Sequence, residues 1–382
     1  MNVIIVGCGK AGSLHRNAYY ELKQNGIFDG KLFFVDKSEK PRWGVFDKDQ
    51  LSGEYFEVKT YRDIHHLMMC ERLDIDDVIV DICLPVGSML TTIEQFKEYG
   101  FKNFICEKPF VFYREKNKCA EKILSGLNIL KVENYLYSKP TIYAKSLIEK
   151  YDIKEKFVVS NFSKNRKMHS SMYRGFCTPD STLTIWEIEI PHEIYLCNNL
   201  FGEIDKITYK CCSDMIVGDL SLKNHGKGTL VCVNKKGSIY MINSNLESTE
   251  MFRTIDAICE NDYTLHIFYS PVCEDSIEFS SGVFLVRKGE IIENQKFRED
   301  NNMYEMLKDY YLTFKYKQTH RFRTVKSIIE YSDFMEKVLE ENNLNYLFDI
   351  RHGIFSDDLV SNNLNINVIK ELVKSSCGVK GG

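Results

Sequence analysis

Three glycines near the start of the chain have the spacing of a dinucleotide-binding turn. Gly7, Gly9 and Gly12 follow the first apolar run of the chain and precede a segment with a helical pattern. Gly7 permits a tight turn, Gly9 lets the backbone approach a pyrophosphate, and Gly12 allows close packing of helix on strand. With Lys10 and Ala11 between them, they predict a pyrophosphate at a helix N-terminus, where unpaired N–H groups and the helix dipole favour an anion.

An aspartate at the end of the second apolar run supports the same interpretation. Asp36 follows Gly12 by 24 residues, where a dinucleotide-binding fold places a carboxylate on the ribose hydroxyls of adenosine. This carboxylate would repel a 2′-phosphate, so it favours NAD over NADP. Lys37, Lys40 and Arg42 keep NADP open as an alternative. The non-functional alternative for Asp36 is a solvated residue at a strand end.

A lysine follows the last apolar run of the first third of the chain. Lys108 stands in the segment Cys106-Glu107-Lys108-Pro109, and parallel sheets bind ligands at the carboxyl ends of their strands. A lysine there can donate a hydrogen bond to a substrate hydroxyl or carbonyl oxygen, and burial lowers its pKa towards a useful range. Pro109 restricts the turn that directs the lysine. The alternative is an exposed lysine in a loop.

A histidine in the middle of the chain is the second candidate for acid–base chemistry. Pro191 suits the first position of a helix, which puts His192 in the first helical turn. A helix N-terminus disfavours imidazolium, so we expect a neutral His192 that can accept a hydroxyl proton. Across one crevice, Lys108 and His192 could move the hydroxyl proton while the adjacent carbon passes a hydride to nicotinamide. A lone histidine is more often an ordinary one.

The elements that must position these residues follow from hydrophobic patterning. Short, continuous apolar runs alternate with amphipathic segments over the first third of the chain, which predicts strands buried on both faces of a parallel, doubly wound Rossmann sheet. We expect its strands near residues 2–6, 31–35, 56–58, 78–83 and 103–106.

Beyond Val132, β-branched and aromatic segments separated by turns predict an α+β unit with a largely antiparallel sheet. Its expected strands lie near 205–213, 229–233, 238–242, 263–269 and 283–287, and its helices near 139–150, 191–201 and 301–340. The predicted domains are therefore a Rossmann domain over 1–133, a substrate and oligomerisation domain over 134–341, and a C-terminal extension over 342–382.

Composition excludes several classes of protein. Fifty Lys and Arg against 54 Asp and Glu leave a net charge of −4, so no global positive field gathers nucleic acid. No apolar run approaches the ~18 residues that span a bilayer, so we expect a cytoplasmic protein without a membrane partner. The 13 cysteines are odd in number and form no C-x-x-C pair, which favours free thiols over disulfides or a metal site.

Together, these motifs resemble the Gfo/Idh/MocA oxidoreductase family, which includes glucose–fructose oxidoreductase and inositol dehydrogenase. The resemblance covers about residues 1–340. It rests on the glycine turn, Asp36, Leu84-Pro85 after the fourth strand, Glu107-Lys108-Pro109, Glu133-Asn134-Tyr135, and His192 placed ten residues before Gly202.

The resemblance implies roles for these residues. Lys108 would be the catalytic lysine, Glu107 and Pro109 would line the nicotinamide side with Leu84 and Pro85, and His192 would be the acid–base or substrate-orienting histidine. It also implies an NAD(P)-dependent oxidoreductase acting on a secondary hydroxyl or carbonyl of a sugar, amino sugar, cyclitol, or a phosphate or nucleotide derivative. A homodimer or homotetramer is implied by the same resemblance.

The chain departs from the family pattern beside the histidine. The family usually has an aspartate four residues before it and often an acidic residue three after it, where this chain has Ile188 and Tyr195. After Leu84-Pro85, Val86 and Met89 replace the usual Asn and His. These departures predict an unusual substrate or shifted chemistry. The candidate substrate residues are Asn134, Tyr135, Arg166, Arg174, Glu189 and Tyr195.

Basic residues between Arg166 and Arg174 suit a phosphate or carboxylate, although a solvated basic loop explains them as well. Two further functions remain open: a glycoside hydrolase or eliminase that oxidises its sugar transiently with NAD, and a non-catalytic module that senses NAD.

Overall fold

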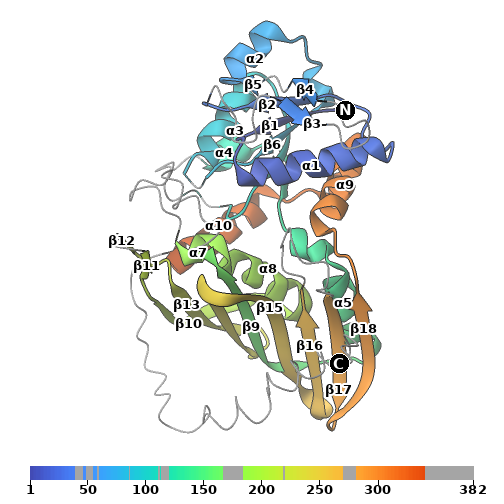
Figure 1. Ribbon diagram of the computed structural model, residues 1–382, viewed down its shortest axis with the longest axis vertical. Helices are drawn as coiled ribbons and strands as arrows, with labels where there is room; N and C mark the ends of the chain where they lie inside the picture. Colours follow the sequence, from blue (N-terminus) through green and yellow to red (C-terminus); the bar gives the residue numbers. More distant parts are fainter. Residues whose placement is uncertain are drawn as a thin grey trace, which may run out of the picture.

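The structure is a computed structural model of the 382-residue chain. It describes residues 1–38, 46–48, 55–57, 60–85, 87–110, 112, 120–166, 184–217, 220–269 and 281–339. Figure 1 shows two sheets, one built from the N-terminal segment and one from the middle of the chain. The predicted C-terminal extension lies outside the described residues.

The first sheet has six strands in the order β5-β2-β1-β6-β7-β8, and every pair in it is parallel. Its strands are β1 (Asn2–Val6), β2 (Leu32–Val35), β5 (Thr60–Tyr61), β6 (Val78–Ile82), β7 (Asn103–Cys106) and β8 (Asn128–Lys131). This confirms the predicted Rossmann-type sheet.

One predicted strand of this sheet was wrong. Residues near 56–58 lie in β4 (Tyr55–Glu57), which pairs with β3 (Phe46–Lys48) in a separate antiparallel hairpin, and the sheet continues through β5 instead. An apolar run does not reveal whether its partner is a local antiparallel strand or a distant parallel one.

Helices cover both faces of this sheet, which explains its continuously apolar strands. On one face, α1 (Lys10–Gln24) and α9 (Asn302–Lys315) bury Tyr19 and Tyr311 against β1. On the other face lie α2 (Ile64–Cys70), α3 (Met89–Glu98) and α4 (Ala120–Leu124).

The second sheet has eight strands in the order β10-β13-β14-β9-β15-β16-β17-β18, and only β14 and β9 pair in parallel. The predicted, largely antiparallel sheet is therefore confirmed. The strands are β9 (Glu155–Asn165), β10 (Ile204–Cys212), β13 (Lys227–Asn234), β14 (Ile239–Asn245), β15 (Glu247–Cys259), β16 (Tyr263–Phe268), β17 (Ser281–Arg287) and β18 (Glu290–Phe297). A two-stranded sheet joins β11 (Met215–Val217) to β12 (Leu220–Leu222).

Helices α5 (Lys139–Lys150) and α8 (Ile190–Phe201) pack on one face of the second sheet, as Figure 1 shows. Alternate residues of β13 and β14 are buried beneath this layer. The short helix α7 (Ile185–Ile188) precedes α8 and begins with a capping box between Thr184 and Glu187. Gly202, with a φ of +118°, ends α8 where a side chain would be strained.

The helical stretch predicted over 301–340 is two helices. A 3₁₀ turn over Thr319–Arg321 lies between α9 and α10 (Val325–Leu339). Helix α9 packs against α1 of the first sheet, so the chain returns to the N-terminal unit after building the second sheet. The domain boundary at residue 133 stays a prediction.

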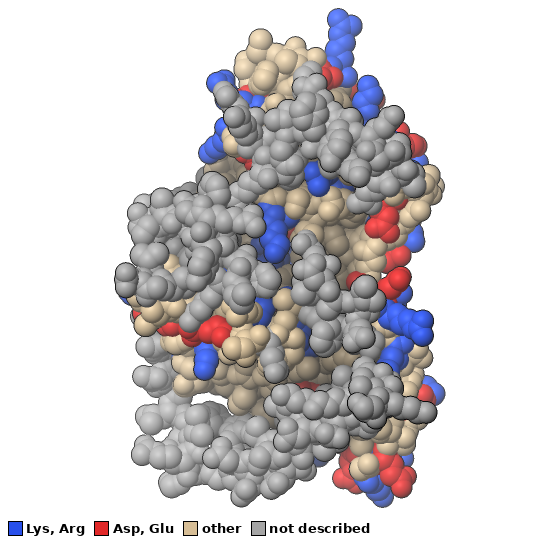
Figure 2. Space-filling model, viewed as in Figure 1, with Lys and Arg blue, Asp and Glu red and all other residues tan. Residues whose placement is uncertain are grey.

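Surface charge is mixed, in keeping with the near-balanced composition. Figure 2 shows acidic and basic side chains interspersed on the face it presents. Of the helices in the described ranges, none combines the length and the apolar character that crossing a membrane requires.

Candidate active site

The predicted phosphate-binding turn joins β1 to α1. Gly7 has a φ of +99°, and a Cβ there would lie 2.7 Å from the carbonyl oxygen of Cys83. A Cβ on Gly12 would lie 2.1 Å from the carbonyl oxygen of Gly7, so the helix could not approach the strand as closely. A Cβ on Gly9 would meet no atom of the described residues within 4 Å. Protein atoms therefore crowd Gly7 and Gly12, whereas there is space beside Gly9.

The open side of this turn fits an anionic cofactor. Gly9 is the N-cap of α1, no side chain caps that end, and the first turn holds no acidic residue. The backbone N–H groups of the first turn are thus available to an anion, and the helix dipole favours one. This arrangement suits the pyrophosphate of a dinucleotide.

Two alanine substitutions should separate cofactor binding from folding. Gly9→Ala puts a methyl group where the pyrophosphate approaches, so NAD(H) affinity should fall by about tenfold or more while the melting temperature stays unchanged. Gly12→Ala forces the backbone apart and should cost about 1–3 kcal/mol of stability. Fluorescence titration and thermal unfolding measure the two effects. Equal losses of stability in both variants would contradict the assignment.

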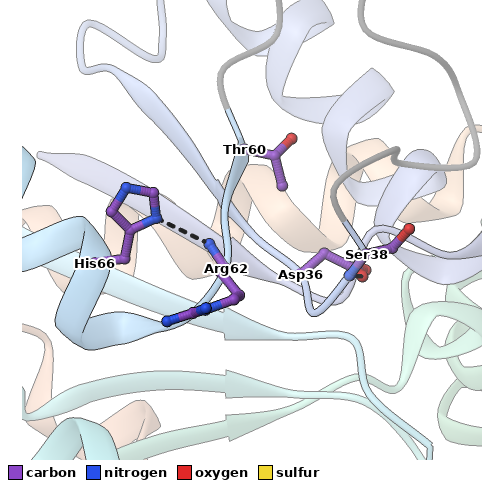
Figure 3. A pocket seen from close by; sticks show the side chains of 5 residues that line it. All are labelled: Asp36, Ser38, Thr60, Arg62 and His66. Atoms are coloured by element: carbon purple, nitrogen blue, oxygen red, sulfur yellow. Dashed lines mark hydrogen bonds between the residues drawn. The ribbon is translucent and has the colours of Figure 1, made fainter.

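Asp36 lies directly beside the turn, at the carboxyl end of β2. Its carboxylate accepts hydrogen bonds from the backbone N–H of Cys8 at 2.6 Å and of Ser38 at 2.8 Å. It borders a pocket of about 370 Å³ that Asp36, Ser38, Thr60, Arg62 and His66 line. Figure 3 shows Asp36 and Ser38 on one side of this pocket and Arg62 and His66 on the other. The pocket suits an adenosine ribose, and its mixed charge permits either NAD or NADP.

The remaining predicted cofactor residues border the same edge of the sheet. Leu84 follows β6 and lies against Gly7, because a Cβ on that glycine would come 2.9 Å from its Cδ2. Lys10 and Pro85 are exposed, and Ala11 is partly buried. Pro109 follows Lys108 through a cis peptide bond.

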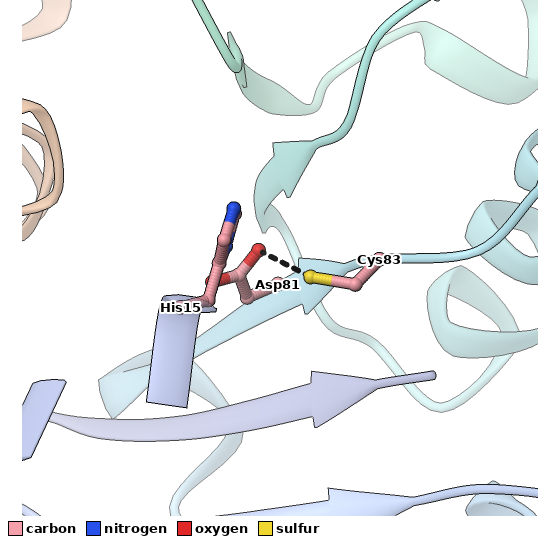
Figure 4. A group of neighbouring side chains, drawn as sticks. All are labelled: His15, Asp81 and Cys83. Carbon is pink, nitrogen blue, oxygen red and sulfur yellow. Dashed lines mark hydrogen bonds and ion pairs between the residues drawn. The ribbon is translucent and has the colours of Figure 1, made fainter. Parts of the chain in front are cut away.

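A buried ion-pair triad of His15, Asp81 and Glu107, which sequence reasoning missed, lies beneath this edge. Figure 4 shows two of its members, His15 and Asp81, together with Cys83. His15 of α1 and Asp81 of β6 are both fully buried, and Nδ1 of the histidine lies 2.8 Å from Oδ2 of the aspartate. Its Nε2 lies 3.2 Å from Oε1 of Glu107. Burial alone lowers the pKa of His15, but the charge of Asp81 and their hydrogen bond outweigh it, so the pKa lies well above its usual value. A cationic His15 thus links the phosphate-binding helix to the residue before Lys108.

The side chains of this cluster already bond to one another, His15 to Asp81 at 2.8 Å and the Cys83 thiol to Asp81 at 3.7 Å. His15, Asp81 and Cys83 place one potential ligand atom each within 4.8 Å of one another. A metal requires a neutral histidine and a thiolate. Both nitrogens of His15 face carboxylates, and burial raises the pKa of the Cys83 thiol to about 12. We interpret the cluster as a structural ion-pair group.

Lys108 reaches from the end of β7 to the second unit. Its ammonium donates a hydrogen bond to the carbonyl oxygen of Ile188 in α7, and its backbone N–H donates to Oε2 of Glu107 at 2.9 Å. Burial is the largest influence on the pKa of Lys108, which lies below its usual value, although Glu189 and Glu107 partly oppose the shift. The lysine therefore lies where the two units meet.

A chain of hydrogen bonds sets the orientation of His192. Its Nδ1 lies 2.8 Å from the hydroxyl of Tyr195, which lies 3.2 Å from Oδ1 of Asn134. The Tyr195 hydroxyl also accepts from the backbone N–H of Tyr135 at 3.3 Å, and the amide nitrogen of Asn134 donates to Asn302. Because a hydroxyl has one proton, Tyr195 donates to Asn134 and accepts from His192. We infer that Nδ1 carries the proton and that Nε2 is free to act as a base.

His192 lies in the first turn of α8, which begins at Ile190, one residue before the predicted start at Pro191. Burial, followed by the positive charge of Lys108, holds the pKa of His192 well below its usual value. These causes add to the helix N-terminus, which also disfavours an imidazolium. Lys108 is therefore close enough to His192 for its charge to act on the imidazole.

Tyr195 and Asn134, two of the predicted substrate residues, form the hydrogen-bond chain at Nδ1 of His192. Tyr195→Phe removes the acceptor of the Nδ1 proton and frees both tautomers, so kcat/KM should fall by about 10- to 100-fold. The pH profile of kcat should shift as well, and a purely structural role would not move it. Steady-state kinetics across pH measure both effects, with Tyr316→Phe on the surface as the control. An unchanged profile would contradict the relay.

Glu189 does not take the place of the missing aspartate. Its buried carboxylate forms ion pairs with Lys164 of β9 and, at 3.7 Å, with Arg253 of β15. Burial raises the pKa of Glu189, but the charges of Lys164 and Arg253 hold it well below its usual value. The ionised carboxylate thus influences His192 only through its charge.

Sequence patterns did not identify Lys164 or Arg253 as residues of the site. Alternation along β9 places Lys164 on the same face as Phe162, a signal that periodicity could have shown. Arg253 comes from a different strand, so only the sheet register reveals it, opposite Phe162. The predicted Arg174 lies outside the described residues.

Neither a protein-family model nor a curated protein sequence matches this chain. Solved structures match it in fold. The match to myo-inositol 2-dehydrogenase from Lactobacillus plantarum is 17% identical, covers 89% of this chain and 96% of that chain, and has a TM-score of 0.64. A 3-ketoreductase from Actinomadura kijaniata, in complex with NADP and TDP-benzene, is 12% identical over 89% of this chain and 97% of its own, with a TM-score of 0.65.

A third match is UDP-N-acetylglucosamine 3-dehydrogenase from Acidithiobacillus ferrooxidans, 12% identical over 89% of this chain and 96% of its own, with a TM-score of 0.60. The matched structures are oxidoreductases of the Gfo/Idh/MocA type. At these identities the likeness shows the fold. The chain therefore has the fold of the Gfo/Idh/MocA oxidoreductases, a Rossmann-type unit joined to a unit with a mostly antiparallel sheet.

Proposed function

We propose that this protein is an NAD(P)-dependent oxidoreductase that interconverts a secondary hydroxyl and a carbonyl on a sugar-like small molecule. The observation that carries the proposal is the closeness of Lys108 to His192: the charge of the lysine lowers the pKa of the histidine, and its ammonium bonds to the carbonyl oxygen of Ile188, four residues before His192. The phosphate-binding turn opens at the carboxyl edge of the same parallel sheet. The matched structures, which include sugar and cyclitol dehydrogenases, support the substrate class.

The nicotinamide, when bound, accepts or supplies the hydride. Nε2 of His192 takes the hydroxyl proton during oxidation and returns it during reduction. The Lys108 ammonium donates a hydrogen bond to the same oxygen and stabilises the negative charge that develops on it. Glu107, held by His15 at 3.2 Å, keeps the backbone of Lys108 in place.

The cofactor would be held by residues at the carboxyl edge of the first sheet, with NAD preferred over NADP because of Asp36. We assign to cofactor binding Gly7, Gly9, Lys10, Ala11, Gly12, Asp36, Leu84, Pro85, Glu107 and Pro109. The Asp36 carboxylate beside the ribose disfavours a 2′-phosphate, while Arg62 across the pocket moderates the preference for NAD.

We also propose that the protein is cytoplasmic and that the second sheet mediates a homodimer or homotetramer. Its edge strand β18 exposes Ile291 and Ile292, and β15 exposes Phe252. Light scattering coupled to size-exclusion chromatography tests this; a monomer at all concentrations would contradict it.

The nucleotide content of the purified protein tests the proposed function. We expect denaturation to release NAD(H), identified by mass spectrometry, or added NAD(H) to bind more tightly than NADP(H) in titration. A panel of sugars, cyclitols and sugar phosphates is then followed by nicotinamide absorbance. If no nucleotide is released and added nucleotide does not bind, the proposal is overturned. Nucleotide binding without any turnover would favour a module that senses NAD.

A further inference from the structure

Positive charge exceeds negative charge around the reacting groups. Lys108, Lys164, Arg166 and Arg253 are close enough to one another for their charges to influence the pKa of Lys108 or Lys164. Glu189 is the carboxylate that pairs with Lys164 and Arg253, and Glu107 is a second carboxylate beside Lys108. Figure 2 shows basic atoms in the middle of the face, at the level where the two sheets approach each other in Figure 1.

The next carboxyl group along α8 does not balance this charge. Glu193 is fully buried, and its two oxygens accept hydrogen bonds from the hydroxyls of Ser160 and Ser244. Burial raises the pKa of Glu193 well above its usual value, because the two serine hydrogen bonds only partly oppose it. Burial therefore disfavours a negative charge on Glu193, and both of its oxygens are already occupied by the two serine hydroxyls.

The Arg253 side chain packs beside two aromatic rings, but its N–H groups lack strong hydrogen-bond acceptors among the described residues. The residue is 6% exposed, and its guanidinium carbon lies 5.7 Å from the ring centroids of both Tyr135 and Phe162. Glu189 lies at 3.7 Å, beyond hydrogen-bonding distance, and N–H of Nη1 faces the weak acceptor sulfur of Met251 at 4.0 Å. Nε has no hydrogen-bond partner among the described residues. A buried donor left without an acceptor is unfavourable, so an acceptor supplied by a ligand would stabilise it.

We propose that Lys164, Arg166 and Arg253 form a subsite for an oxyanion of the substrate, a carboxylate or a phosphate, beside the hydroxyl that reacts. The inference rests on the proposed oxidoreductase function for its location next to Lys108 and His192. Arg253 presents a planar fork of donors that suits such a group, and Lys164 adds a compact positive charge. Glu189 forms ion pairs with both side chains and offsets part of their charge when the subsite is empty.

Two small anions test the subsite directly. Inorganic phosphate and L-tartrate are titrated into the protein, with and without saturating NADH, and binding is followed by calorimetry. We expect binding of at least one anion that weakens with added salt, and Arg253→Met or Lys164→Met should weaken it by about 10- to 100-fold. Tighter phosphate binding would assign a phosphate group, and tighter tartrate binding a carboxylate.

The controls separate this inference from the proposed function. Lys156→Met removes an exposed cation from the same strand as Lys164 and should leave anion binding unchanged. Arg253→Lys retains the charge if the methionine variant does not fold, and it should give an intermediate affinity. Absence of anion binding, or equal binding by Arg253→Met, would overturn the subsite even if NADH binds and neutral sugars react. Anion binding without NADH binding would support the subsite and contradict the oxidoreductase function.

Discussion

Changing Lys108 to methionine lowers the rate of hydride transfer by about 10²- to 10⁴-fold, the range expected when a positioned proton donor is lost. Methionine retains the length of the side chain but cannot donate to the developing oxyanion. The backbone contacts of residue 108 to Glu107 remain, so NAD(H) binding persists. Single-turnover absorbance of the nicotinamide, on the substrate found in the panel, measures the rate.

Two variants control this experiment. Lys102→Met removes an exposed lysine just before the same strand, whose ion pair with Asp76 at 3.4 Å lies in solvent, and should leave the rate unchanged. Lys108→Arg keeps a positive charge in a bulkier, planar form and should recover only part of the loss. A normal rate in Lys108→Met with NAD(H) bound would exclude Lys108 from the chemistry.

Removing the charge of Asp81 should have the largest effect on stability. Asp81→Asn leaves His15 as a buried cation facing only Glu107, and breaking a buried ion pair in this way costs about 3–5 kcal/mol. Urea unfolding measures the loss. Asp76→Asn removes an exposed carboxylate instead and should change stability by less than about 0.5 kcal/mol.

The loss of stability in Asp81→Asn should depend on pH, and the raised pKa of His15 sets the direction of that dependence. The pKa of His15 in the folded state lies well above the value of 6.5 for a free histidine. The stabilisation is therefore fully present below that value and disappears as pH rises through the folded pKa. The difference between wild type and Asp81→Asn should be larger in mildly acidic than in alkaline buffer. The double variant His15→Leu/Asp81→Leu should recover part of the loss, and an equal difference at both pH values would contradict the ion pair.

Much of the cofactor site could be predicted from the chain because its parts are local. Gly7, Gly9 and Gly12 lie within one turn, and Asp36 and Lys108 each follow an apolar run that predicts a strand. In a parallel sheet the carboxyl ends of strands meet at one edge, so the order of elements was enough to place these residues together. The same reasoning predicted both sheets, which the structure confirms. It wrongly placed the strand near residues 56–58 in the parallel sheet, because β4 pairs with a local hairpin strand.

The substrate side could not be predicted in this way, because its contacts join residues far apart in the chain. Tyr195 and Asn134 join His192 in one hydrogen-bond chain, and Arg253 comes to lie opposite Phe162 only through the register of β15 on β9. Buried polar groups need partners, but sequence alone does not say which ones.

Sequence patterns thus determined the Rossmann-type sheet, the glycine turn and the two candidates for the reacting pair, since these depend on short-range spacing and strand order. Tertiary packing decided the direction in which the pKa values of His15, His192 and Glu193 shift, the hydrogen-bond partner of His192, and the clustering of Lys164 and Arg253 around Glu189. Burial and nearby charges set these properties, and both depend on which distant side chains the folded chain brings together.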